Sequence, residues 1–169
     1  TVGSAYYKDG TGEFVMSGDM DNNTGSVDLT SGSNTIVSST TPDSSSIKMI
    51  MSGLGIEGFS SVDRGMLKIL DGSDELSVDA NLKDETGSLV IKQGDVSVEA
   101  SGDKINKTGS LSAVIGSNEL GGVLTTDSSS LGLKSGSVEF SVSGDRNGDA
   151  GSLSFKEGTV ETRLGFNKS

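Results

Sequence analysis

Two acidic segments carry side-chain oxygens at alternate positions, which is how a loop begins to wrap a hard cation. The residues are Asp19, Asp21 and Asn23 in the first segment and Asp145, Asn147 and Asp149 in the second. Calcium loops use oxygen ligands at their first, third and fifth positions. Calcium is therefore the one cofactor that the sequence suggests, with these six residues as its ligands.

The same residues also suit ordinary turns, because Asp and Asn hydrogen-bond to nearby backbone and tolerate left-handed geometry. The segments depart from the helix–loop–helix calcium loop, since glycine is seventh instead of sixth and Thr30 or Lys156 stands where glutamate is needed. Residues 103–107, which match the first segment in the second half of the chain, lack the ligands. Turn formation is the favoured interpretation, and a weak calcium site is the alternative.

Catalytic chemistry has few side chains to use in this chain. The sequence contains no histidine and no cysteine, which excludes Ser–His–Asp and Cys–His arrangements. Pairs of carboxylates can hydrolyse glycosides, but aromatic residues, which form sugar platforms, make up only 4% of the chain. We therefore expect no enzyme activity and assign no catalytic residue.

Five apolar residues are candidates for contact with a partner. Tyr6 and Tyr7 form the one aromatic pair outside the regular pattern, and a strand turns them to opposite faces. Leu54, Ile56 and Phe59 lie in residues 52–63, a glycine-rich stretch that we expect to be a bulged strand or a loop.

The acidic balance limits the partners of this protein. The net charge is −11 at pH 7, whereas binding to nucleic acid needs a basic surface. No apolar run approaches the roughly 18 residues of a membrane span, so we expect no membrane insertion. An acidic, cysteine-free chain rich in Ser, Thr and Gly favours an extracellular or virion-surface location.

The elements that must position these residues are strands. Apolar residues alternate with polar ones throughout, as in Leu89 and Ile91, in Val96, Val98 and Ala100, and in Leu111, Ala113 and Ile115. This period of two is typical of a strand with one buried face. Glycines at tight turns supply the positive φ of hairpins. We predict an all-β fold, an antiparallel hairpin meander of about 14 short strands.

The chain also contains an internal duplication. Residues 2–47 align without a gap onto residues 86–131 and share the motifs Ser-Gly-Asp, Thr-Gly-Ser, Gly-Ser-Asn and Asp-Ser-Ser-Ser. The sequence thus divides into halves, 1–84 and 85–169, which we expect to share one continuous core. A sheet with one apolar face must bury it, so closure as a barrel or sandwich is predicted, with a β-solenoid as the alternative.

Repeats more often build a surface or scaffold than a catalytic centre. The first hypothesis is therefore a non-catalytic structural or assembly protein, a surface-exposed β-repeat component of a phage particle or microbial extracellular fibre. Its partners would be further copies or neighbouring structural subunits. The alternative is an adhesin-like barrel or sandwich that binds a glycan or host receptor through its loops.

Overall fold

The computed structural model describes residues 1–145, 147 and 149–167, and these residues form strands joined by short turns. The chain divides into two compact units, residues 1–83 and 84–169. The division lies one residue from the boundary between the halves expected from the duplication. The predicted all-β meander of antiparallel hairpins is confirmed in each unit.

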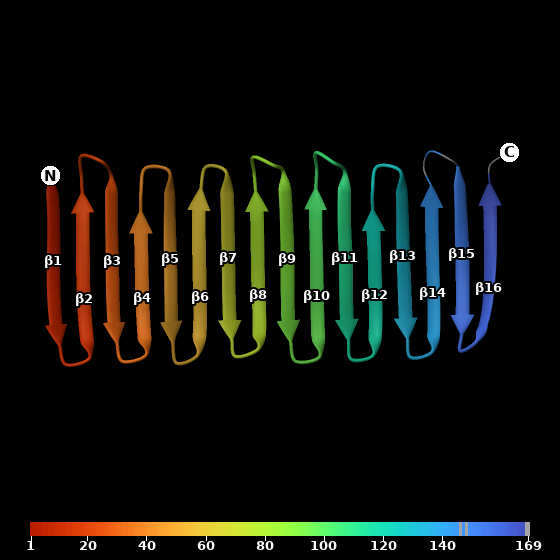
Figure 1. Cartoon of the computed structure of the whole chain (residues 1–169), viewed down its shortest axis with the longest axis horizontal. Coiled ribbons are helices and arrows are strands. Elements are labelled where there is room, and N and C mark those ends of the chain that lie inside the picture. Colours follow the sequence, from red (N-terminus) through yellow and green to blue (C-terminus); the bar gives the residue numbers. More distant parts are fainter. Residues whose placement is uncertain (146, 148, 168–169) are drawn as a thin grey trace. The chain divides into compact units, whose positions relative to one another are not determined.

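Unit 1 is an eight-stranded antiparallel sheet in which each strand pairs with the next one along the chain (Figure 1). Its strands are β1 (Val2–Asp9), β2 (Gly12–Asp19), β3 (Thr24–Ser31), β4 (Asn34–Thr40), β5 (Ser44–Met51), β6 (Leu54–Ser61), β7 (Arg64–Asp71) and β8 (Asp74–Asn81).

Unit 2 repeats this arrangement with another eight strands in sequence order. They are β9 (Thr86–Gln93), β10 (Val96–Asp103), β11 (Thr108–Ile115), β12 (Asn118–Leu124), β13 (Ser128–Ser135), β14 (Val138–Asp145), β15 (Ala150–Glu157) and β16 (Val160–Asn167). The described strands thus number sixteen, two more than the sequence suggested.

Two-residue turns at one end of each sheet fix the strand register. In most of them glycine stands first with positive φ, as at Gly94 between β9 and β10, where φ is 53°. This is the position at which a type II′ hairpin turn requires glycine. The β5–β6 turn instead has positive φ at both Ser52 and Gly53, which is the requirement of a type I′ turn.

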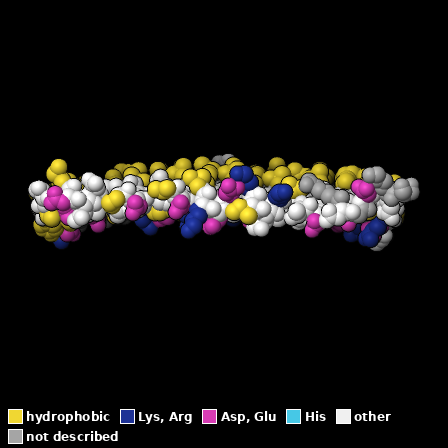
Figure 2. All heavy atoms as spheres, turned by 90° about the horizontal axis from the view of Figure 1, so that it is seen from above, with side chains coloured by type: hydrophobic (Ala, Val, Ile, Leu, Met, Phe, Trp, Pro, Cys, Tyr) yellow, Lys and Arg dark blue, Asp and Glu magenta, His cyan; other side chains and the backbone are white. Residues whose placement is uncertain are grey.

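The register places the alternating side chains of each unit on two distinct faces. We call the hydrophobic one the apolar face and the other one the polar face. In unit 1 the apolar face carries Ala5, Tyr7, Phe14, Met16, Val27, Leu29, Ile36, Ile47, Met49, Met51, Leu54, Ile56, Leu67, Ile69, Leu76, Val78 and Ala80. In unit 2 it carries Leu89, Ile91, Val96, Val98, Ala100, Leu111, Ala113, Ile115, Leu120, Leu124, Leu131, Leu133, Val138, Phe140, Val142, Leu153, Phe155, Val160, Leu164 and Phe166. Figure 2 shows hydrophobic side chains gathered on one face within each unit, opposite most of the charged ones.

Neither unit closes on itself as the predicted barrel, whereas the predicted sandwich and the alternative solenoid are both consistent with its open meander. The continuous core expected of the two halves stays a prediction. Each sheet is open, since no described register pairs β1 with β8 or β9 with β16. No described hydrophobic side chain is fully buried, and Leu111 and Phe155 are 39% and 43% exposed. The physical reason is that every strand pairs only with its chain neighbours in the described registers, so the strands of a unit form a single layer and supply no second layer for its apolar face.

Residues 52–63, expected to be a bulged strand or loop, contain the regular strand β6. Ile56 pairs with Met49 on one side and Ile69 on the other. Gly58 of this strand leaves room for a neighbour, because a Cβ there would meet the Ile47 side chain at 3.0 Å. Cross-strand packing therefore explains Gly58, while Gly53 supplies a positive φ in the β5–β6 turn.

Candidate functional site

The first acidic segment forms the four-residue turn between β2 and β3. Asp19 Oδ1 accepts hydrogen bonds from the backbone N–H of Asp21 at 3.0 Å and of Asn22 at 3.4 Å, and Asp19 Oδ2 accepts one from Asn22 Nδ2 at 2.6 Å. The hydrogen bond from the Asn22 side chain is the main cause that lowers the pKa of Asp19. Asp21 pairs with the amino group of Thr1, and Asn23 has a φ of 51°.

The corresponding turn of unit 2, between β10 and β11, adopts the same arrangement without the same acidic residues. Asp103 accepts hydrogen bonds from the backbone N–H of Asn106 at 2.8 Å and from its side-chain amide at 2.6 Å. These two bonds, the backbone one first, lower the pKa of Asp103. Lys107 takes the place of Asn23 with a φ of 55°. The Asp–Asn hydrogen bonds thus accompany the turn whether or not the calcium-like pattern is present.

The second acidic segment lies between β14 and β15. Asn147 donates from its backbone N–H to Asp145 at 2.8 Å and from its side chain to Asp127 at 2.6 Å, which links two neighbouring turns. Asp149 has a φ of 47°. The described part of the chain contains no group of three or more acidic residues placed to hold a metal ion. Calcium binding at either segment stays a prediction, and the turn interpretation accounts for the hydrogen bonds seen.

Tyr6 and Tyr7 lie on β1, and each is 63% exposed. They point to opposite faces, as expected from a strand. Tyr7 pairs with Phe14 on the apolar face, whereas Tyr6 pairs with Val15 on the polar face. The two rings therefore cannot form one binding surface.

The other three interaction candidates also lie on different faces of the sheet. Leu54 and Ile56 belong to the apolar face of unit 1, where they pair with Met51 and Met49. Phe59 lies on the polar face opposite Met66. The structure thus makes Leu54 and Ile56 part of an extended surface instead of a loop site, and their role in binding stays a prediction.

Two features are most open to a partner: the edges of the sheets, and whole apolar faces, which sequence reasoning expected to be buried. β1 pairs only with β2, and β16 only with β15, among the described registers. Every residue of both strands is exposed. The signal in the sequence was the low hydrophobic content, 31%, which is too little for a thick core.

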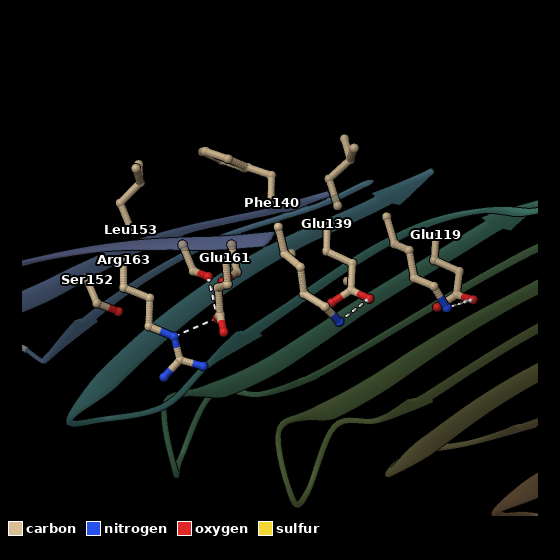
Figure 3. Close-up of a pocket in the computed structure, with 14 residues that line it drawn as sticks. Glu119, Glu139, Phe140, Ser152, Leu153, Glu161 and Arg163 are labelled. Atoms are coloured by element: carbon tan, nitrogen blue, oxygen red, sulfur yellow. Dashed lines mark hydrogen bonds and ion pairs between the residues drawn. The ribbon is translucent and has the colours of Figure 1, made fainter. Parts of the chain in front are cut away.

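The polar face of unit 2 contains a shallow groove lined by residues of β12 to β16. Its floor is a cross-strand row of small residues, Gly121, Gly132, Ser141 and Ser154. Figure 3 shows Glu119, Glu139, Glu161 and Arg163 projecting from this side of the sheet, whereas Phe140 and Leu153 project from the other.

Charges of alternating sign border this groove in one cross-strand row. Lys134 lies 3.3 Å from Glu119, and Lys156 lies 3.3 Å from Glu139. Glu161 accepts hydrogen bonds from Arg163 at 2.6 Å and Ser154 at 3.1 Å, and these bonds, the Arg163 one first, lower its pKa. Exposed pairs of this kind add little to stability, so the row orders side chains more than it stabilises the sheet.

Comparison with known proteins does not suggest a function, so a proposal must be argued from the surfaces described above. No protein-family model matches the chain, and no curated protein matches it either. Among the described residues, no helix is long and apolar enough to cross a membrane.

Proposed function

We propose that this chain is a non-catalytic structural protein whose copies join edge to edge. It would serve as a surface-exposed β-repeat component of a phage particle or a microbial extracellular fibre. The observation that carries the proposal is the complete exposure of the edge strands β1 and β16. Unpaired N–H and C=O groups along such an edge are a template for a strand of another chain.

The charges on the two edges support strand addition. Natural proteins protect an edge with charged side chains, proline or bulges. In β1 the charged Lys8 is paired with Glu13 of β2 at 3.7 Å, and in β16 Glu161 is paired with Arg163. Neither strand contains proline. β1 is charged only at Lys8 and Asp9, and β16 only at Glu161 and Arg163, so the uncharged remainder of each edge stays open to an approaching strand.

Pairing of β16 in one copy with β1 in another joins two different surfaces. Such a heterologous contact builds an open filament when the rotation between copies does not close a ring. A fibre or a particle component assembles from contacts of this type. The absence of histidine and cysteine from the sequence agrees with a role that needs no nucleophile or imidazole base.

Proline substitutions in β1 test the proposal. Consecutive residues of a strand direct their N–H groups to opposite sides, so one of Ser4→Pro and Ala5→Pro loses a bond to β2 while the other only blocks the open edge. We expect the variant that keeps the parental melting temperature to form no filaments in negative-stain micrographs, while the parent forms them. Absence of filaments from the parent, or their persistence in both variants, would contradict edge-to-edge assembly.

Glycan or receptor binding is the second candidate, and the groove on the polar face of unit 2 favours it (Figure 3). Its serine and charged side chains can exchange hydrogen bonds with sugar hydroxyls. The turns offer less, because they are only two to four residues long. Saturation-transfer NMR tests this candidate by comparing the glycan signals in the presence of the parental protein and of Ser141→Trp, whose large side chain blocks the groove. A signal that the variant abolishes would indicate groove binding, and no signal with the parent would indicate no binding.

A further inference from the structure

The proposed edge pairing leaves the apolar face of unit 2 unexplained. Edge contacts extend a sheet in its own plane and cover neither face. On this face Leu131 and Leu133 are 48% and 49% exposed, and Leu164 and Phe166 are 60% and 61% exposed. Monomeric soluble proteins rarely expose a contiguous apolar patch larger than a few hundred Å², so this surface needs an occupant.

The area of the face fits a stable dimer. Each strand of unit 2 has seven or eight residues. With a rise of about 3.3 Å per residue and a strand spacing of about 4.8 Å, eight strands cover roughly 1,000 Å². Two copies that meet through this face would bury about 2,000 Å² in total, which lies where obligate homodimer interfaces begin.

The charge distribution fits a second copy of the same chain. Glu157 is the one charged residue that the strand registers place on the apolar face of unit 2. The ion-paired rows from Glu119 to Arg163 lie on the polar face (Figures 2 and 3). Two sheets stacked about 10 Å apart would keep these rows on their outer sides, further apart than the Debye length of about 8 Å. These rows contain charges of both signs in pairs, so they add little repulsion between the two copies.

The surface relief also fits another sheet better than a small ligand. The apolar face mixes large side chains with glycines, as where Phe166 of β16 lies over Gly151 of β15. Large and small side chains on two facing sheets interdigitate in β-sandwiches. We propose that the apolar face of unit 2 packs against the same face of a second copy, which gives an isologous, two-layered dimer.

Single cysteines test this proposal, because the chain has none of its own. Phe140→Cys places a thiol on the apolar face, and Ser141→Cys, the next residue of β14, places one on the polar face. The rate of reaction with a polar thiol reagent is measured on the full chain over a range of protein concentrations. Far-ultraviolet circular dichroism checks that each variant keeps its strands, and Leu133→Cys serves as a second apolar-face position.

We expect the thiol at position 140 to react at least tenfold more slowly than that at 141 at high protein concentration, and to become as reactive on dilution. Equal rates at all concentrations would show an uncovered face and overturn the proposal. Slow reaction at every concentration would show that something other than a second copy covers the face, and would overturn it as well. The proline variants of β1 report on edges alone, so failure of either proposal is recognised without the other.

Discussion

The two faces of unit 2 are built from the same strands, yet they differ in how far their side chains find partners within the sheet. The polar face satisfies itself: Ser101 and Ser110 share a hydrogen bond of 2.7 Å, as do Ser143 and Ser152, and lysines pair with glutamates between strands. Among its described residues, the apolar face includes one such bond, from Ser135 to Asn118 at 2.6 Å, and it leaves Phe155 43% exposed. The difference shows that strand pairing alone holds the layer in register, while the burial that stabilises a fold must come from outside the layer.

The largest contrast between the faces is expected at two neighbouring residues of β11. Leu111→Asp removes an apolar side chain opposite Ala100 and Gly122 and places a carboxylate on the face to be covered. We expect it to lower the free energy of unfolding by about 2 kcal/mol or more. Ser112→Asp, on the polar face, should change it by less than about 0.5 kcal/mol. Urea unfolding measures both, and equal losses would refute the distinction between the faces.

A smaller effect is expected at the glycines of the apolar face. A Cβ on Gly151 would collide with the ring of Phe166, whereas one on Gly102 has nothing within 4 Å. Gly151→Ala should therefore displace Phe166 and lower the melting temperature by roughly 3 °C, which corresponds to about 1 kcal/mol. Gly102→Ala should leave it unchanged or raise it slightly. Phe166→Ala should lower the melting temperature no further once Gly151→Ala is present. Additive losses in the double variant would contradict this packing.

The smallest effect concerns the ion pairs of the polar face and depends on pH. Arg163 and Ser154 lower the pKa of Glu161, so the folded state binds this proton less tightly than the unfolded chain does. The contribution is present above the ordinary glutamate pKa of about 4.3 and is lost as the pH falls through the lowered folded value. The melting temperature of the parent should fall more between pH 5 and pH 2 than that of Glu161→Gln. If the melting temperatures of the parent and of Glu161→Gln fell in parallel with pH, the pair would make no contribution to the stability of the sheet.

The strands and their faces could be predicted from the sequence because period-two alternation follows directly from strand geometry. The grouping of Val96, Val98 and Ala100 with Leu111 and Ala113 on one face is confirmed by the register, in which Val98 lies opposite Ala113. The positive φ of the hairpin glycines is confirmed too. Both properties are local, so a single sequence contains them.

Closure and covering could not be predicted, because they depend on what meets a face and not on the pattern along a strand. Alternation at Leu111 and Ala113 is the same in a barrel, a sandwich or an open layer. Residues 52–63 misled for a related reason. Gly58 leaves room for Ile47 of the adjacent strand, and this contact cannot be recognised before the pairing is known. The acidic turns are similar, since Asp19 and Asp103 form the same hydrogen bonds in sequences that look different.

Turns of only two to four residues join the strands, and every described pairing in a unit is one between immediate chain neighbours. Contacts of low sequence separation need little loop closure, so such sheets are expected to fold fast for all-β structures. Lengthening the gene by one more hairpin would require no rearrangement of the existing ones, because each strand is specified by the strand before it. The connectivity therefore allows the sheet to grow by tandem copying of hairpins. The matching halves are one instance of such copying.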